Sequence, residues 1–166
     1  MSKIGIFYGS TTGTTEHVAG MVAEALGASA ADVHDVSKAS PSDVGAYDVV
    51  ILGSSTWGDG DMQDDMQDFI DGLKALDLKG KKMAFFGCGD ESMTDTFCNA
   101  VGKMYESLKG TGAQIIGAYQ ADGYDFSHSD ADVDGSFVGL LIDNVNHEDM
   151  TAARVNGWVD ELKKEI

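Results

Sequence analysis

The stretch Gly9-Ser10-Thr11-Thr12-Gly13-Thr14-Thr15 determines how the rest of the chain is interpreted. It lies between an apolar run at residues 4–8 and a helical pattern that begins near Glu16, and so it predicts a turn from a strand into a helix. Such a turn presents backbone N–H groups and the positive end of a helix dipole, and its hydroxyls add further donors. The stretch therefore suits a bound phosphate, or it is a helix start that caps itself with Ser and Thr.

The composition is that of an acidic globular chain. With 166 residues, of which 43% are hydrophobic, the chain is long enough for one sizeable core, and we expect one domain over residues 1–166. The 28 acidic and 11 basic residues give a formal net charge of −17. This charge excludes nucleic acid and anionic membrane surfaces as partners, because both bind a basic surface.

Cysteine usage and the lack of long apolar runs indicate a compartment. Cys88 and Cys98 are the two cysteines, and their spacing matches no disulfide framework, zinc site or redox motif. The start of the chain lacks the apolar stretch of a signal peptide, and no run approaches about 18 apolar residues. We therefore expect a cytoplasmic protein without membrane insertion.

Strand and helix patterns alternate along the chain, which predicts βαβ units and a parallel sheet covered on both faces. A Gly- and Asp-rich segment interrupts the alternation, and we interpret about residues 119–136 as an insertion into the last strand. The expected strands are residues 3–8, 32–36, 47–53, 82–87 and 113–118, with an apolar run at 137–142. The first expected helix begins near Thr14. Three others span Met62 to Leu73, Phe97 to Leu108 and Val155 to Leu162, and a short turn of helix is expected at Ser40–Asp43.

Three segments with ligand-binding character follow the ends of expected strands, where open parallel sheets bind their ligands. They are residues 10–15, the loop 54–62 and residues 87–94. The second carries Trp57 followed by Gly58, and an aromatic side chain on such a loop is either a stacking platform or a cover for the loop itself.

This ligand edge is expected to be strongly negative. Neither Lys nor Arg occurs in residues 4–37, 39–73 or 83–102, whereas Lys3 and Lys79 to Lys82 lie at strand starts, on the opposite edge. A free polyanion would be repelled at the ligand edge, but a single phosphate held by backbone amides would not. The acidic residues near the three segments are Asp59, Asp61, Asp64, Asp65, Asp90, Glu91 and Asp95.

Together these segments resemble the flavodoxin family. Residues 10–15 look like its phosphate-binding loop, residues 55–60 like its flavin-stacking loop, residues 87–90 like its third loop, and residues 122–140 like the insertion of the long-chain branch. The resemblance covers essentially the whole chain and implies an α/β, flavodoxin-like, doubly wound, five-stranded parallel sheet of order 2-1-3-4-5. Helices cover both faces, and the insertion lies in the last strand. This family is itself a general example of ligand binding at the point where strand order reverses, so the order comes with the resemblance and not from the residues.

The resemblance implies a cofactor, FMN, and a role for each loop. The first loop would hold the FMN phosphate, Trp57 would stack on one ring face, and a carbonyl of Gly58-Asp59 would accept a hydrogen bond from flavin N5–H in the semiquinone. Many relatives place a tyrosine on the other face. Here the nearest counterpart is Met93. Either its polarizable thioether covers that face, or the face is more open than in those relatives. The implied cofactor-binding residues are Ser10, Thr11, Thr12, Gly13, Thr14, Thr15, Ser55, Thr56, Trp57, Gly58, Asp59, Gly60, Cys88, Gly89, Asp90, Met93 and Asp95.

The implied function is that of a low-potential electron-transfer protein, not an enzyme. It would shuttle single electrons between redox enzymes as its FMN cycles through quinone, semiquinone and hydroquinone, with no catalytic residue and no metal. As a monomer it would dock on basic surfaces of a flavin- or iron–sulfur-containing reductase and of acceptor enzymes. The alternative is a flavodoxin-like FMN-dependent NAD(P)H:quinone oxidoreductase, although the lack of basic residues between Lys109 and Arg154 offers no place for an NADPH phosphate.

Other motifs indicate structural roles. Asp130 to Gly135 matches half of an EF-hand loop, but Leu141 occupies the position of the required Glu, so we expect a solvated acidic loop. Acidic neighbours are expected to raise the pKa of Cys88 and to prevent a nucleophilic role, and Cys98 is expected within a helix, partly buried. The histidines show no metal-ligand spacing and are expected at the surface or in turns: His17, His34, His128 and His147.

Overall fold

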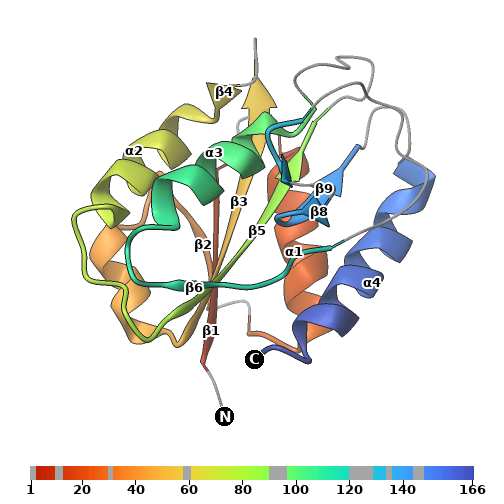
Figure 1. The fold of residues 1–166 in the computed structure, drawn as a ribbon. Coiled ribbons are helices and arrows are strands. Elements are labelled where there is room, and N and C mark those ends of the chain that lie inside the picture. Colours follow the sequence, from red (N-terminus) through yellow and green to blue (C-terminus); the bar gives the residue numbers. More distant parts are fainter. Residues whose placement is uncertain are drawn as a thin grey trace.

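A parallel sheet forms the centre of the molecule in the computed structural model (Figure 1). Its main strands are β1 (Ile4–Gly9), β2 (Val33–Asp35), β3 (Val49–Trp57), β5 (Lys82–Cys88) and β6 (Gln114–Ile115), in the order β2-β1-β3-β5-β6. This order confirms the predicted 2-1-3-4-5, because β5 and β6 are the fourth and fifth parallel strands. The structure describes residues 3–9, 13–29, 32–57, 61–89, 97–119, 129–133, 136–143 and 148–166, with only the backbone of Trp57, Asp61 and Val133.

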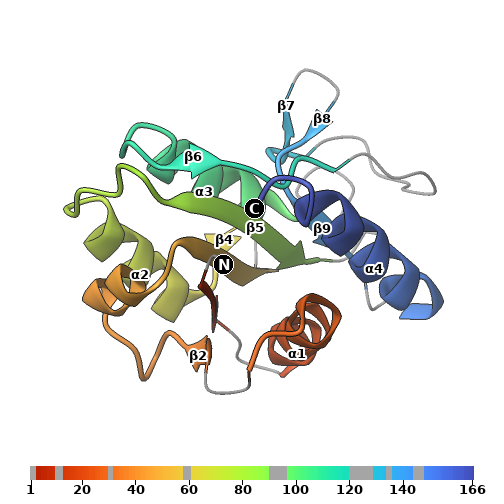
Figure 2. The same ribbon diagram turned by 90° about the horizontal axis from the view of Figure 1, so that it is seen from below.

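Helices cover both faces of the sheet, as predicted (Figures 1 and 2). On one face lie α1 (Thr14–Leu26) and α4 (Thr151–Leu162), and on the other lie α2 (Asp64–Leu73) and α3 (Asn99–Leu108). Successive side chains of a strand point to opposite faces. Ile51 and Phe86 therefore belong to the core under α1 and α4, whereas Leu52 and Phe85 belong to the core under α2 and α3.

The last strand is split by the predicted insertion. Strand β6 pairs with the start of β5, at Lys82 and Met83, and β9 (Leu140–Ile142) pairs in parallel with its end, at Phe86 to Cys88. Between them, β7 (Asp132–Val133) and β8 (Ser136–Phe137) form an antiparallel pair. The expected strand 113–118 was too long, since regular pairing ends at Ile115 and Gly117 adopts a φ of 82° that turns the chain out of the sheet.

The loop predicted at residues 54–62 is wrong in part, because strand pairing continues through it. Strand β3 runs on to Trp57, and β4 (Asp61–Met62) folds back antiparallel to it, with Thr56 opposite Met62. Met62 therefore belongs to a strand and not to the helix predicted from it. Helix α2 begins only at Asp64 because the side chain of Gln63 caps it, accepting a hydrogen bond from the N–H of Met66 at 2.9 Å.

Short helical segments complete the chain. The expected turn at residues 40–43 is the start of a longer 3₁₀ segment, η2 (Pro41–Ala46), and a second one, η3 (Glu148–Met150), leads into α4. Cys98 lies before α3 and not within it as predicted. Its backbone has a φ of 50°, and its buried thiol contacts the carbonyl of Gly87 at 3.6 Å. Within the described ranges, no helix has both the length and the apolar character needed to cross a membrane.

A glycine in β3 provides a test of how tightly the sheet packs on its helices. A Cβ at Gly53 would lie 2.1 Å from Cζ of Phe86, whose ring is buried beside Trp158. We expect Gly53→Ala to lower the free energy of unfolding by about 2 kcal/mol or more, because a fully packed core accommodates an added methyl only by strain. Urea unfolding measures this change.

Gly20 offers the matched control for the same substitution. It is exposed within α1, and no atom lies within 4 Å of a Cβ built there. Gly20→Ala should raise the free energy of unfolding by about 0.5–1 kcal/mol, because alanine has the higher helix propensity. Equal effects of the two substitutions would contradict the packing described for Gly53.

Candidate cofactor-binding site

The three predicted ligand segments leave the sheet at neighbouring points. In the parallel register, Gly9 of β1 lies beside Ser54 of β3, Ser54 lies beside Gly87 of β5, and Ser55 lies beside Cys88. All three strands therefore end at the same edge of the sheet, the upper edge in Figure 1. After β1 the chain enters α1 on one face, and after β3 it enters α2 on the other, which is the arrangement that creates a ligand crevice between strand ends.

The first segment ends at the N-terminus of α1. Gly13 is the N-cap residue, with a φ of 91° in the left-handed region, and its carbonyl accepts a hydrogen bond from the N–H of His17 at 3.0 Å. Gly13 has no side chain with which to cap the helix. The alternative of a helix start capped by Ser and Thr concerns residues 10–12, which lie outside the described part of the chain, and the helix start has the dipole and N–H direction that favour an anion.

Thr15, Ser55 and Cys88 meet beneath the strand ends. The Oγ1 of Thr15 and the Oγ of Ser55 are 2.6 Å apart, and Cys88 lies beside Ser55 in the parallel register of β3 and β5. Their exposed fractions are only 0%, 8% and 6%. One residue from each of the three predicted segments thus takes part in a single buried polar cluster.

The second segment is held in place by its neighbours. Ser54 accepts a hydrogen bond at its Oγ from the N–H of Gln63 at 3.1 Å and donates to the carbonyl of Ser55 at 2.9 Å. Thr56 accepts from the N–H of Ala100, at the start of α3, at 3.3 Å. One acceptor position of the Thr56 hydroxyl is thereby filled by the protein, and the backbone of the hairpin is paired as far as Trp57 and Asp61.

The third segment is anchored where it leaves β5. The N–H of Gly89 donates to the carbonyl of Ile142 in β9 at 2.9 Å, and the Cys98 thiol lies 3.8 Å from that same carbonyl. The site therefore depends on positioning residues that the sequence reasoning did not single out: Ser54, Gln63, Cys98 and Ile142. The run of three hydroxyls at 54–56 and the position of Gln63 before a helix were the available signals for two of them.

Burial, and not acidic neighbours, raises the pKa of Cys88. Desolvation of the thiolate raises this pKa to about 12, and the hydrogen bond from Thr15 lowers it by a smaller amount. The predicted direction was correct, and its predicted cause was wrong. The neutral thiol is a weak hydrogen-bond donor and is not a nucleophile at physiological pH.

Several predicted site residues lie outside the described part of the chain. Gly13, Thr14, Thr15, Ser55, Thr56, Cys88 and Gly89 are described, and all seven lie at the loop edge of the sheet or directly beneath it. The side chain of Trp57 is outside the description, as are Ser10, Thr11, Thr12, Gly58, Asp59, Gly60, Asp90, Met93 and Asp95.

Two other predictions concern residues away from this site. His34 was expected at the surface or in a turn, but it lies half-buried in β2, stacked on Phe7 at 4.9 Å between ring centroids, with its Nε2 2.7 Å from the hydroxyl of Tyr47. The Asp130 to Gly135 segment contributes β7 to the small antiparallel pair and is not an open loop throughout. Across the described ranges, no group of three or more His, Cys, Asp or Glu side chains could hold a metal ion.

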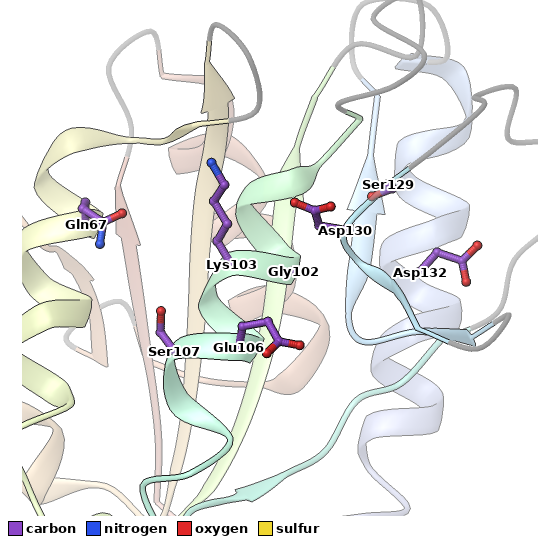
Figure 3. Close-up of a pocket in the computed structure, with 8 residues that line it drawn as sticks. All are labelled: Gln67, Gly102, Lys103, Glu106, Ser107, Ser129, Asp130 and Asp132. Atoms are coloured by element: carbon purple, nitrogen blue, oxygen red, sulfur yellow. The ribbon is translucent and has the colours of Figure 1, made fainter.

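A groove of about 470 Å³ lies on the outer side of α3 and not over the strand ends (Figure 3). The lining includes the cation Lys103 as well as the carboxylates of Glu106, Asp130 and Asp132, so it carries both signs of charge. The groove contains none of the seven described site residues. It is lined by Gln67, Gly102, Lys103, Glu106, Ser107, Ser129, Asp130 and Asp132.

Comparisons with known proteins agree on one family. The family model described as flavodoxin matches residues 6–158. Flavodoxin 1 of Escherichia coli strain K12 is 42% identical over 168 aligned residues, covering 100% of this chain and 96% of the relative, and a flavodoxin of Synechococcus elongatus is 40% identical, with 100% and 99% covered. A crystal structure of a Fusobacterium nucleatum flavodoxin variant bound to flavin mononucleotide superposes with a TM-score of 0.91 at 26% identity, covering 100% of this chain and 98% of the other.

The buried thiol of Cys88 predicts a loss of stability in alkali. From its ordinary value of 9.0, the folded-state pKa is raised to about 12, so above about pH 9 the unfolded chain binds fewer protons than the folded protein. The stabilisation is complete below about pH 9 and is lost as pH rises, by at most about 1.4 kcal/mol per pH unit. Urea unfolding of the wild type and of Cys88→Ser between about pH 8 and pH 11 measures it.

The Cys88→Ser variant should lose stability less steeply above about pH 9, because it has no titrating thiol at this position. The tyrosines whose pKa is also raised by burial, Tyr8, Tyr47 and Tyr119, are present in both proteins and contribute equally. Parallel curves for the two proteins would contradict the burial argument.

Proposed function

The chain belongs to the flavodoxin family, and on this basis we propose that it carries single electrons between redox enzymes on one non-covalently bound FMN. The observation that carries this proposal is the convergence of three segments of the family's type at adjacent ends of β1, β3 and β5. In this function the protein is an electron carrier and has no substrate of its own. We also propose that residues 1–166 form one domain of the long-chain type and that the protein acts as a monomer in the cytoplasm.

The N-terminus of α1 is the proposed position of the FMN phosphate. Residues 10–12 together with Gly13, Thr14 and Thr15 would bind it through backbone N–H groups and hydroxyls. Support comes from the left-handed conformation of Gly13 at the N-cap of this helix. All of these donors are neutral, so the phosphate would be held without a lysine or an arginine.

The isoalloxazine ring is proposed to lie between the second and third segments. Trp57 would cover one face, Met93 the other, and the Gly58-Asp59 peptide would hydrogen-bond to N5–H, with further contacts from Ser55, Thr56, Gly60, Cys88, Gly89, Asp90 and Asp95. Bound FMN would supply two separate one-electron steps. The anchored backbone at Trp57 and at Gly89 supports this assignment, because a ring held between two loops requires that both loop bases be fixed.

Charge separation along the sheet supports a low potential. Lys3 precedes β1, and Lys81 and Lys82 lie at the start of β5, where the Nζ of Lys81 donates to the carbonyl of Tyr47 at 2.6 Å. These cations lie at the edge opposite the three loops, so little positive charge offsets the carboxylates near the ring. Additional negative charge on the ring is disfavoured there, which lowers the second one-electron potential.

The net charge of −17 favours partners with basic docking surfaces. We propose a flavin- or iron–sulfur-containing reductase and its acceptor enzymes as the partners. Their association with this protein would weaken as salt screens the surface charges.

Reconstitution with FMN tests the proposed function directly. The purified protein, stripped and reloaded with FMN, should bind one FMN and show two resolved one-electron steps in a potentiometric titration followed by its visible spectrum. A protein that binds no FMN, or that takes up both electrons in a single step, would overturn the proposal. Appreciable steady-state turnover of NAD(P)H and a quinone by the protein alone would instead support the oxidoreductase alternative.

A lysine placed at the phosphate end tests the electrostatic argument. Thr14 is half-buried at the first position of α1, so a longer side chain there can extend toward solvent. Thr14→Lys should raise the second one-electron potential by about 10–30 mV at low salt, because one added positive charge roughly 10 Å away stabilises the more negative state. Thr14→Gln is the neutral control. An unchanged potential at low ionic strength would refute the argument.

A further inference from the structure

We propose that Ser129, in the insertion, is a positioning residue for the ring end of the FMN site. Its hydroxyl holds the point at which the chain that connects Gly89 to Phe97, here called the 89–97 connection, enters α3. This inference rests on the proposed function, since it takes the third segment as one of the two loops beside the isoalloxazine ring. It goes beyond that function because it gives the insertion a part in holding the cofactor.

The two ends of the 89–97 connection lie side by side. A Cβ built on Gly89 would lie 2.9 Å from the backbone nitrogen of Cys98 and 3.2 Å from Cδ1 of Phe97. The chain therefore leaves β5 and returns to nearly the same point before it enters α3. Because fixed ends restrict the conformations of any connecting chain, the positions of Gly89 and Phe97 bear directly on Met93 and Asp95 of the proposed site.

Each end of the connection is anchored by a different part of the chain. The N–H of Gly89 donates to the carbonyl of Ile142 in β9 at 2.9 Å, and at the other end the hydroxyl of Ser129 donates to the carbonyl of Phe97. A carbonyl oxygen only accepts, so the direction of this second bond is determined. Ser129 is only 1% exposed, and its Oγ also accepts from the N–H of Ala131 at 3.1 Å. Its hydroxyl is therefore held from both sides.

Two further contacts tie the first turns of α3 to the insertion. The Oδ1 of Asn99, a buried residue, accepts from the N–H of Asp130 at 2.8 Å. A Cβ at Gly102 would lie 2.3 Å from the carbonyl oxygen of Asp130, so the two backbones are in close contact there. Ser129 and Asp130 accordingly lie beside α3 in Figure 3. The insertion thus supports the start of this helix through its backbone as well as through the Ser129 hydroxyl.

The start of α3 also contacts the second segment and the end of β5. Thr56 accepts from the N–H of Ala100 at 3.3 Å, and the Cys98 thiol lies 3.6 Å from the carbonyl oxygen of Gly87. This helix start is therefore joined to both loops that are proposed to hold the ring. Helix α1, which begins at the proposed phosphate end, packs on the other face of the sheet. We therefore expect a displacement at Phe97 to alter the ring end of the site and to leave the phosphate end in place.

A purely structural role for Ser129 predicts a different result from a positioning role. Removing a hydroxyl that only stabilises the fold lowers the free energy of unfolding and leaves the flavin affinity of the folded protein unchanged. Removing a positioning hydroxyl changes the affinity and the potential of the flavin in protein that remains folded. The change should affect FMN and riboflavin, which is FMN without its phosphate, to the same extent, because it lies at the ring end.

The experiment measures the dissociation constants of FMN and of riboflavin for the stripped protein, by quenching of flavin fluorescence, and the second one-electron potential of the FMN-loaded protein. We expect Ser129→Ala to weaken both flavins by about fivefold, which corresponds to the loss of one neutral hydrogen bond. The second one-electron potential should rise, because water admitted at the ring end stabilises the more negative state. Asn99→Ala breaks another contact of the same junction and should act in the same direction.

Matched variants separate the hydroxyl from packing and from general stability. Ser129→Thr and Ser129→Val have side chains of nearly the same shape that differ in the hydroxyl, and the threonine variant should bind both flavins more tightly than the valine variant. Ser136→Ala removes an exposed hydroxyl from β8, in the same insertion, and should change neither constant. Leu108→Ala opens the buried core at the other end of α3, so it should lower stability without changing flavin affinity.

The possible outcomes distinguish this inference from the proposed function. If folded Ser129→Ala keeps the wild-type affinities and potential, the positioning role is refuted and the proposed function stands. The inference is also refuted if Ser129→Ala weakens FMN alone, if Leu108→Ala weakens both flavins as much, or if the threonine and valine variants bind equally. A wild type that binds neither flavin overturns both the inference and the proposed function.

Discussion

Parallel pairing among β1, β3 and β5 is the constraint on which the rest of this structure depends. The three strands are buried on both faces, so the backbone groups in their interior must find partners within the sheet. A shift of the register by one residue would exchange the two faces of the strand. Ile51 would then lie in the core under α2 and α3, and Leu52 would lie in the core under α1 and α4. The register is therefore fixed by packing, and it also fixes where three loops begin. The juxtaposition of Ser54, Ser55 and Cys88 is a consequence of core packing far from the loops themselves.

Most of the fold could be predicted from the sequence because the signals were local and redundant. Alternating strand and helix patterns gave the parallel sheet and its two helical layers, and the Gly- and Asp-rich segment revealed the insertion. The errors arose where a tertiary contact decided the local structure. Met62 has the spacing of a helical residue with Met66, yet it is held in β4 by pairing with Thr56. Cys98 matches the apolar stripe of α3, yet its contacts with Gly87 and Ile142 hold it outside the helix.

The candidate site followed the same division between local and long-range information. The sequence indicated which loops gather, since strand ends of a parallel sheet share one edge. It could not indicate that Thr15, Ser55 and Cys88, separated by 40 residues and by 33 further residues along the chain, form one buried cluster. For Cys88 the sign of the pKa shift was predicted from nearby carboxylates, but burial produces that shift. Burial depends on the packing of α1 over the sheet, which no local pattern reports.

The split of the last strand links the insertion to the cofactor edge. An uninterrupted strand after Ile115 would continue pairing along β5, whereas the chain leaves the sheet and returns as β9, beside Phe86 to Cys88. The return passes through Gly139, where a Cβ would lie 2.2 Å from the carbonyl oxygen of Phe85, so only glycine allows so close an approach. Once back in the sheet, Ile142 accepts the hydrogen bond from Gly89 that anchors the third loop. The insertion therefore does more than extend the surface, because the strand that follows it anchors the third loop of the proposed FMN site.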